Sequence, residues 1–423
     1  MVELQKKSRV CLNLRSVKNL NIKVVDAMCG QGKTSWAIQY MNENKDKRFI
    51  FVTPFLNEVA RIQDKCGFEV PSDDNKIRKI DDFKRLVDEN KSIATTHKLL
   101  SHLTVEMVSM IKNSDYILIL DEVIESVTES QLSDGDKKAL IKLGLIKEVD
   151  GNLFRGDEDV IESFNEGSWA YSYIITGLKR KNLEIFEGKI LMWLFPIDIL
   201  NCFREIYILT FLFDGYPLSS YLKFNKLSYT KYSVCSNDDG YEIIDYVGTD
   251  TSKFKSLIAL YDDEKINAIG NDVSAFSDYW WKNTARKNAD ILLELRKNIE
   301  NVVKNRAKCK IDDVLWTVFK DYEGLVYNTR TKDKNFISHN LRATNNYAEK
   351  STCIYLVNRN YNPIIKRWFK SKDIEVNNDY YKLGEAIQWI FRSRIRKDEP
   401  INLYIPSIAV RSLFISWLNG DLK

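Results

Sequence analysis

The chain lacks the features that mark several large classes of protein. Its seven cysteines include no Cys-x-x-Cys pair and it has only three histidines, so the sequence argues against a zinc site. An odd and unpatterned set of cysteines fits the reducing interior of a cell. The longest apolar run, residues 190–195, is far too short to span a bilayer, and the N-terminus has no apolar signal-peptide core. We therefore expect a soluble, cytoplasmic protein that binds no membrane.

The chain also lacks a strong net charge. It has 63 Lys and Arg against 59 Asp and Glu, which gives a net charge of only +4. Any contact with nucleic acid must therefore come from a local groove. The chain has 423 residues, of which 44% are hydrophobic, and this predicts two or three domains with substantial cores. No internal repeat or low-complexity linker interrupts it.

What the chain does have is a glycine-rich loop at residues 27–34, Ala-Met-Cys-Gly-Gln-Gly-Lys-Thr, directly after an apolar run at 22–26. Between a strand and a helix, such a loop turns its backbone N–H groups toward phosphate. Lys33 would reach the β- and γ-phosphates, and the Thr34 hydroxyl would hold Mg²⁺. The alternative is a glycine-rich loop that binds nothing. The residues expected to bind ATP are Gly30, Gln31, Gly32, Lys33, Thr34 and Ser35.

Short apolar runs alternate with helical patterns through the first half of the chain. Runs at 22–26, 49–53, 92–95, 116–120, 190–194 and 207–210 read as strands, and the segments 35–42, 57–65 and 105–111 read as helices. This alternation predicts an α/β domain with a parallel sheet that is covered on both faces. We assign it to residues 1–228, with a helix and a hairpin inserted at about 124–189. Asp150-Gly151 marks the hairpin turn, and this insertion is a surface elaboration or a strand-separating pin.

A second α/β domain is expected at residues 229–423. Residues 267–305 read as largely helical, and strand-like runs follow at 314–319, 353–357 and 402–405. Further helices are expected at 381–394 and 408–418.

Asp121-Glu122 follow the apolar run at 116–120, about 90 residues after the glycine-rich loop. Ligands of parallel sheets bind at the carboxyl ends of strands, where both motifs lie. Asp121 would hold Mg²⁺, and Glu122 would accept the proton of the attacking water.

Four threonines lie at the ends of predicted strands, at the same edge of the sheet. Thr210 is a candidate for coupling the nucleotide state to a nucleic-acid track, or else a threonine that caps a turn. Thr53-Pro54 and Thr95-Thr96 suit contacts with a phosphate backbone, because small hydroxyl side chains and loop N–H groups gather there.

Gln388, Arg392 and Arg396 form the sharpest pattern of the second half. Spaced four apart, they would share one face of a helix, with Arg394 pointing elsewhere. Arginine forks match phosphate oxygens and stabilise charge on a transferring phosphoryl group. The alternative is a solvated basic helix face.

Two other segments are weaker candidates for contacts with a nucleic-acid strand. Trp316 lies in the predicted strand at 314–319 and would stack on a base, although core packing is the alternative. The polar residues Arg342, Thr344 and Asn345 lie between apolar flanks and would line a cleft.

Taken in order, these motifs resemble those of superfamily 2 helicases. Residues 27–34 match motif I, Thr53-Pro54 motif Ia, Thr95-Thr96 motif Ib, Asp121-Glu122 motif II, Leu209-Thr210 motif III, 316–320 motif IV, 342–345 motif V and 388–396 motif VI. The stretches 209–215, 342–345 and 388–393 most resemble small helicase-like proteins of phages and prophages of low-GC bacteria. This resemblance implies two RecA-like domains in tandem, with ATP and Mg²⁺ in the cleft and a nucleic-acid strand across both.

Two departures leave functional alternatives open. Motif III reads Leu-Thr-Phe, and the arginines of motif VI follow Gln388 by four and eight residues rather than four and seven, so the identity of the arginine finger is open. The leading hypothesis is an ATPase that moves along or unwinds single-stranded or forked DNA in phage or mobile-element replication, with replication proteins as partners, in a bacterial host cell. The alternatives are a nucleotide-switched loading or remodelling factor and a role in defence or counter-defence.

Overall fold

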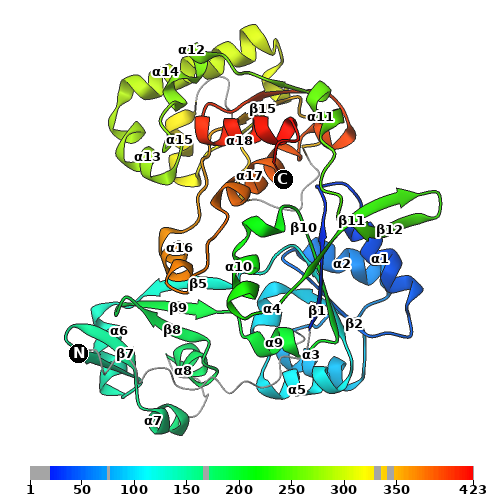
Figure 1. Cartoon of the computed structure of the whole chain (residues 1–423), viewed down its shortest axis with the longest axis vertical. Helices are drawn as coiled ribbons and strands as arrows, with labels where there is room; N and C mark the ends of the chain where they lie inside the picture. The colour runs from blue at the N-terminus through cyan, green and yellow to red at the C-terminus, as the bar shows by residue number, and fades with distance from the viewer. Residues whose placement is uncertain (1–19, 74–76, 165–170, 328–334, 341–346, 423) are drawn as a thin grey trace.

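The computed structural model describes residues 20–73, 77–164, 171–327, 335–340 and 347–422. Arg342, Thr344 and Asn345 lie outside the described residues. Figure 1 shows three parts, namely two helix-covered sheets and a smaller inserted region with α6 to α8. Within the described residues, no helix is long and apolar enough to cross a membrane.

The first sheet has the strand order β12-β11-β1-β10-β4-β2-β3 among the described residues. The strands from β11 to β3 pair in parallel, and only β11 and β12 are antiparallel. Their bounds are β1 Asn21–Asp26, β2 Phe49–Thr53, β3 Ile93–Thr96, β4 Ile117–Asp121, β10 Glu205–Thr210, β11 Thr230–Asn237 and β12 Gly240–Asp245.

Helices cover both faces of this sheet. They are α1 Lys33–Glu43, α2 Leu56–Cys66, α3 Lys79–Asp88, α4 His97–Ser101, α5 Val105–Asn113, α9 Ile197–Asn201 and α10 Pro217–Phe224. Val24 and Ile50 belong to one core cluster, while their neighbours Val25 and Phe51 belong to another. Successive side chains of a strand point to opposite faces, so these apolar runs bury both faces, as the sequence predicts.

The inserted region follows β4. It contains β5 Val127–Gln131, α6 Asp134–Lys142, β6 Ile146–Val149, β7 Asn152–Arg155, α7 Glu158–Ser163, α8 Ser172–Lys179, β8 Leu183–Phe186 and β9 Ile190–Leu194. The predicted hairpin is confirmed, because Val149 pairs with Asn152 across Asp150 and Gly151, whose φ angles are 51° and 75°. The prediction of a core strand at 190–194 is wrong. This strand pairs antiparallel with β5 and β8, so the insertion extends to Leu194.

The second sheet has the order β13-β16-β15-β14 among the described residues, with all neighbours parallel. Its strands are β13 Ile258–Leu260, β14 Val314–Thr317, β15 Thr352–Tyr355 and β16 Ile401–Tyr404. Its larger helices are α11 Ser252–Leu257, α13 Asp278–Asn283, α14 Ala289–Asn301, α17 Asn378–Ile390 and α18 Ile408–Leu418. The predicted class, α/β with two parallel-sheet domains in tandem, is confirmed.

The predicted boundary between residues 228 and 229 is too early. β11 and β12 extend the first sheet beyond β1, so residues 230–245 belong with the first domain. A later segment also joins the first domain: in α16, Pro363–Lys370, the side chains of Ile365, Trp368 and Phe369 share the core cluster that contains Val24. The chain therefore crosses between the two halves more often than a simple division in sequence implies.

Candidate nucleotide site

The glycine-rich loop turns sharply into helix α1. Gly30 and Gly32 have φ angles of 86° and 88°, in the left-handed region that side chains disfavour. Gly32 is the N-cap of α1, and no side chain caps it. The first N–H groups of a helix have no partner within the helix, and the helix dipole adds partial positive charge there. The geometry of the loop and of the start of α1 therefore suits the phosphate binding that the sequence predicts.

The Lys33 side chain folds back over this loop. Its Nζ atom donates to the carbonyl oxygens of Ala27, at 2.5 Å, and Met28, at 2.9 Å. The loop is held at its base as well, because the Ala27 N–H donates to the Thr210 carbonyl at 3.0 Å. The ammonium group thus lies within the curve of the loop, where it meets any phosphate that the loop binds.

Thr34 and Asp121 meet beside the loop. The Thr34 hydroxyl donates to Oδ1 of Asp121 at 3.1 Å, which joins the start of α1 to the end of β4. A hydroxyl and a carboxylate are hard oxygen donors of the kind that Mg²⁺ prefers, so this pair fits the predicted ion. Burial raises the pKa of Asp121 to about 7, and the nearby charge of Glu122 adds to this rise.

The raised pKa of Asp121 gives a test of stability against pH. Because the carboxyl binds its proton more tightly in the folded chain, stability falls as pH rises from the ordinary value of 3.8 to about 7, and then levels off. We expect Asp121→Asn to raise the free energy of unfolding of the nucleotide-free protein by about 2–4 kcal/mol at pH 8, and by less at pH 5. Chemical denaturation at both pH values measures this. A gain that is equal at both pH values contradicts the account.

Glu122 adopts an unusual backbone conformation. Its φ is 74°, and its N–H donates to the Leu209 carbonyl on the neighbouring strand at 3.0 Å. A non-glycine residue in the left-handed region costs about 1–2 kcal/mol and persists only where its surroundings hold it. This strained residue directly follows Asp121, the last residue of β4.

Motif VI reaches this loop from the second half of the chain. A Cβ atom placed on Gly30 would lie 3.4 Å from Cγ and 3.7 Å from Nε of Arg396. The predicted helix over 381–394 is wrong at its end: α17 stops at Ile390, Ser393 is extended, and Arg394 begins a 3-10 turn. Arg392 and Arg396 therefore do not share a helix face, although both lie near the loop.

Cys29 marks the point where the two halves converge. Burial raises the pKa of its thiol, and four charged side chains act on that pKa: Lys33, Glu122, Arg392 and Arg396. The first two come from motifs I and II, and the arginines come from motif VI. Arg394, in contrast, donates to the Pro400 carbonyl, on its own side of the turn. Four of the residues predicted to take part in ATP hydrolysis therefore gather around one loop.

Gln388 does not reach this loop. Its amide Nε2 donates to the Tyr216 hydroxyl, on the segment after β10, at 2.8 Å. The same hydroxyl lies 3.5 Å from Glu385, whose carboxylate accepts from Arg359 at 2.7 Å. Gln388 thus makes a contact between the two halves, and its catalytic role stays a prediction.

The segment after β10 also contacts the base of the phosphate loop. Asp26, which ends β1 and is buried, accepts the N–H groups of Leu212 at 2.7 Å and Phe213 at 3.1 Å. Burial raises the pKa of Asp26, and Lys231, 3.6 Å away, opposes this rise. Thr210, predicted to couple the two sites, is buried beside them. One short segment thus joins motif I to α17.

The residues predicted to contact nucleic acid differ in how deeply they are buried. Thr53 and Thr95 are buried at the ends of β2 and β3, whereas Pro54 is exposed and Thr96 is half-buried. Trp316 is fully buried against Phe336, at 4.9 Å between ring centroids, so the prediction that it stacks on a base is wrong. It packs in the core because its strand, β14, is covered by α13 and α14.

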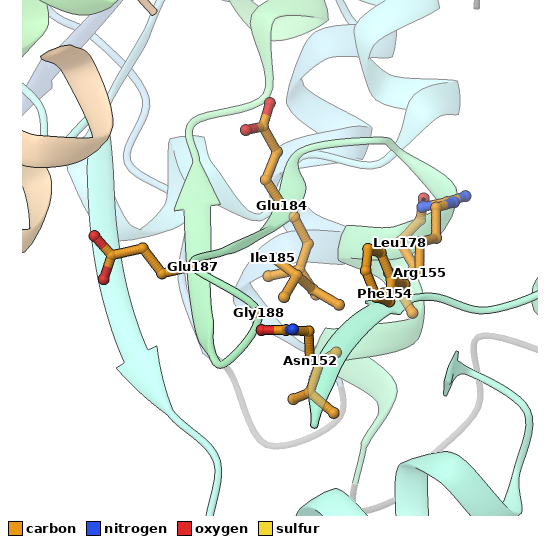
Figure 2. A pocket seen from close by; sticks show the side chains of 10 residues that line it. Asn152, Phe154, Arg155, Leu178, Glu184, Ile185, Glu187 and Gly188 are labelled. Carbon is orange, nitrogen blue, oxygen red and sulfur yellow. Dashed lines mark hydrogen bonds between the residues drawn. The ribbon is translucent and has the colours of Figure 1, made fainter. Parts of the chain in front are cut away.

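A cavity of about 530 Å³ lies in the inserted region, between β7, α8 and β8. Figure 2 shows its lining, which includes Asn152, Phe154, Arg155 and Glu184. None of the predicted site residues lines it.

Sequence reasoning missed Asp26 and Tyr216. An acid at the end of the apolar run 22–26 is a visible signal for Asp26, because a buried carboxylate needs partners. Tyr216 carries no such signal, since its partners are far away in sequence.

Comparison with known proteins identifies the family of the chain. A profile of the YonV C-terminal Rossmann-like domain matches residues 252–418. The SPbeta prophage-derived uncharacterized protein YonV of Bacillus subtilis (strain 168) is 34% identical over 412 residues, which cover 95% of this chain and 99% of that protein. The chain belongs to the YonV family.

Solved structures with a similar fold include an XPD helicase, at a TM-score of 0.42 and 11% identity, over 96% of this chain and 95% of that one. Xpd4 of S. tokodaii matches with the same TM-score of 0.42 and 9% identity, over 94% of both chains. At these values the likeness carries no inference about activity. The predicted resemblance to a prophage-encoded protein is confirmed by this relative of prophage origin.

Proposed function

We propose that the protein is a nucleic-acid-dependent ATPase of superfamily 2 that translocates along or unwinds DNA. One observation carries this proposal: Arg392 and Arg396, from the second half of the chain, lie at the phosphate loop that the first half builds. A catalytic centre shared between two domains turns nucleotide binding into a change of their relative position.

Each residue of the centre has a separate task. Lys33 and the N–H groups at the start of α1 bind the phosphates of ATP. Thr34 and Asp121 hold Mg²⁺, which neutralises charge on the phosphate oxygens when bound. Glu122 accepts the proton of the attacking water, and the arginines stabilise the charge that develops on the transferring group.

The proposed track is single-stranded or forked DNA. The half-buried Thr96 and the exposed Pro54 lie at the carboxyl edge of the first sheet, where the Thr96 hydroxyl and the N–H groups of neighbouring loop residues suit contacts with a phosphate backbone. The relative of prophage origin supports a role in phage or mobile-element replication, together with replication proteins, in a bacterial host cell.

One observation favours the alternative, a nucleotide-switched loading or remodelling factor that separates no strands. Helix α16 lies between β15 and α17 of the second half in sequence but packs on the first half, where Arg367 pairs with Glu187 at 3.0 Å and Trp368 donates to Glu184 at 3.1 Å. The Asn362 amide donates to Glu129 at 2.7 Å. These contacts restrain the relative movement of the two halves, which suits a switch more than a long-range motor.

Steady-state ATP hydrolysis, measured with and without single-stranded DNA and RNA, tests the proposal. We expect strong stimulation by single-stranded DNA, and Lys33→Ala serves as the control that must abolish it. Hydrolysis that is indifferent to both nucleic acids contradicts the motor and favours the nucleotide switch.

A further inference from the structure

The hairpin of β11 and β12 lies directly on the phosphate loop. Figure 1 shows it beside α1, at the edge of the first sheet beyond β1. Tyr241 follows the hairpin turn, and a Cβ atom placed on Gly32 would lie only 2.2 Å from Cε1 of its ring. The ring edge therefore rests against the glycine that precedes Lys33. This contact gives position 32 a second reason, besides its φ of 88°, to be glycine.

A hydrogen bond fixes the hairpin in this place. The Tyr241 N–H donates to Oε1 of Gln39, on α1, at 2.8 Å. The Gln39 amide in turn donates to Glu43 at 2.8 Å. A Cβ atom on Gly240 would lie 2.4 Å from Oε1 of Gln39, so this glycine permits the close approach. The position of the Tyr241 ring is thus set by α1, the same helix that begins the phosphate site.

The order of the strands fixes the direction of a bound nucleotide. Asp121 ends β4, which lies on one side of β1, whereas β11 and β12 lie on the other side. The reacting phosphate must lie at Asp121 and Glu122. The nucleoside end of the molecule then extends the opposite way, over the start of α1 and toward the hairpin. Tyr241 is the aromatic side chain that this hairpin places against the loop.

We propose that Tyr241 forms the nucleoside subsite of the ATP site and packs against the base, with Gln39 beside it as a polar partner. The inference rests on the proposed function, since it names the residue that recognises the base of the same nucleotide. Tyr241 is half-buried, so part of its ring remains accessible beside the loop. Aromatic rings stack on bases through their π-faces, and purines, with two fused rings, offer the larger face.

Binding of two probes to the full chain tests this inference, namely ATP and inorganic tripolyphosphate, both with Mg²⁺ and measured by calorimetry. We expect Tyr241→Ala to weaken ATP binding about tenfold or more and to leave tripolyphosphate binding unchanged. Tyr241→Phe keeps the ring and should bind ATP as the native chain does. The preference for ATP over CTP should shrink in Tyr241→Ala only. Tyr232→Ala, on the same hairpin, is the matched control and should change neither affinity.

The outcomes separate this inference from the proposed function. If Tyr241→Ala weakens the binding of ATP and of tripolyphosphate equally, Tyr241 only supports the conformation of the loop. This result overturns the inference but not the proposed ATP site. Unchanged ATP binding in Tyr241→Ala overturns it too. A native chain that binds neither probe overturns the proposed function, and the subsite falls with it.

Discussion

Glu122→Gln is expected to lower the maximal rate of ATP hydrolysis by about 10²- to 10⁴-fold while ATP and strand binding persist. The amide keeps the size of the side chain but cannot accept a proton from water. The backbone at Glu122, with φ at 74° and its N–H bonded to Leu209, does not depend on the charge. The substitution therefore removes one chemical step and leaves the site assembled.

Three measurements on this variant test the role of Glu122, namely steady-state hydrolysis, equilibrium binding of ATP and retention of single-stranded DNA, and its biological activity separates the functional alternatives. Glu125→Gln, at an exposed position three residues later, is the matched control and should hydrolyse ATP at the native rate. A motor loses its biological activity with its turnover, whereas a nucleotide switch keeps most of it. Native turnover in Glu122→Gln would remove Glu122 from the mechanism.

The strands of the first sheet could be predicted because burial on both faces leaves a continuous apolar run. The run 49–53 matches β2 exactly in its bounds, since every residue of that strand is buried. The run 190–194 has the same character but pairs within the insertion. Apolar composition reports burial and not the identity of the neighbouring strand. The hairpin of β11 and β12 could not be predicted for the opposite reason. Much of it is exposed, so its sequence contains no continuous apolar run.

Some residues of the candidate site could be predicted from the sequence and others could not. Lys33, Thr34 and Asp121 could be named from the sequence, because their chemistry depends on local motifs. The partners of Tyr241 and Asp26 could not be predicted, since they lie in distant segments: Asp26 accepts the N–H of Leu212, 186 positions later. A local pattern shows that a group is suited to phosphate, and only the fold shows what holds that group in place.

The departure at motif VI has a physical basis in the end of α17. Four-residue spacing from Gln388 suggests a continuous helix, but Ser393 has φ −74° and ψ −176°, which breaks it. The break lets Gln388 bond Tyr216 within the interface while the later arginines turn toward the loop. The unusual spacing is therefore accommodated by a change of backbone rather than by a shared helix face.

Arg396→Ala is expected to lower the maximal rate of ATP hydrolysis by about 10³-fold with little loss of ATP affinity. Its side chain lies beside Gly30, because a Cβ atom placed on Gly30 would be 3.4 Å from Cγ of Arg396. Arg396 is also exposed to solvent. An arginine fork stabilises charge that appears only as the phosphoryl group transfers, so the loss falls on the rate. Arg396→Lys should recover little of it, because an ammonium group lacks the planar fork.

The neighbouring arginines separate catalysis from packing. Arg392 is only 7% exposed, so Arg392→Ala should lower the thermal midpoint as well as the rate. Arg394 bonds the Pro400 carbonyl, and Arg394→Ala should hydrolyse ATP nearly as the native chain does. Rates, ATP affinities and thermal midpoints of the three alanine variants decide the assignment. If Arg394→Ala loses the rate while Arg396→Ala keeps it, the finger is Arg394, and the turn after Ile390 must rearrange when ATP binds.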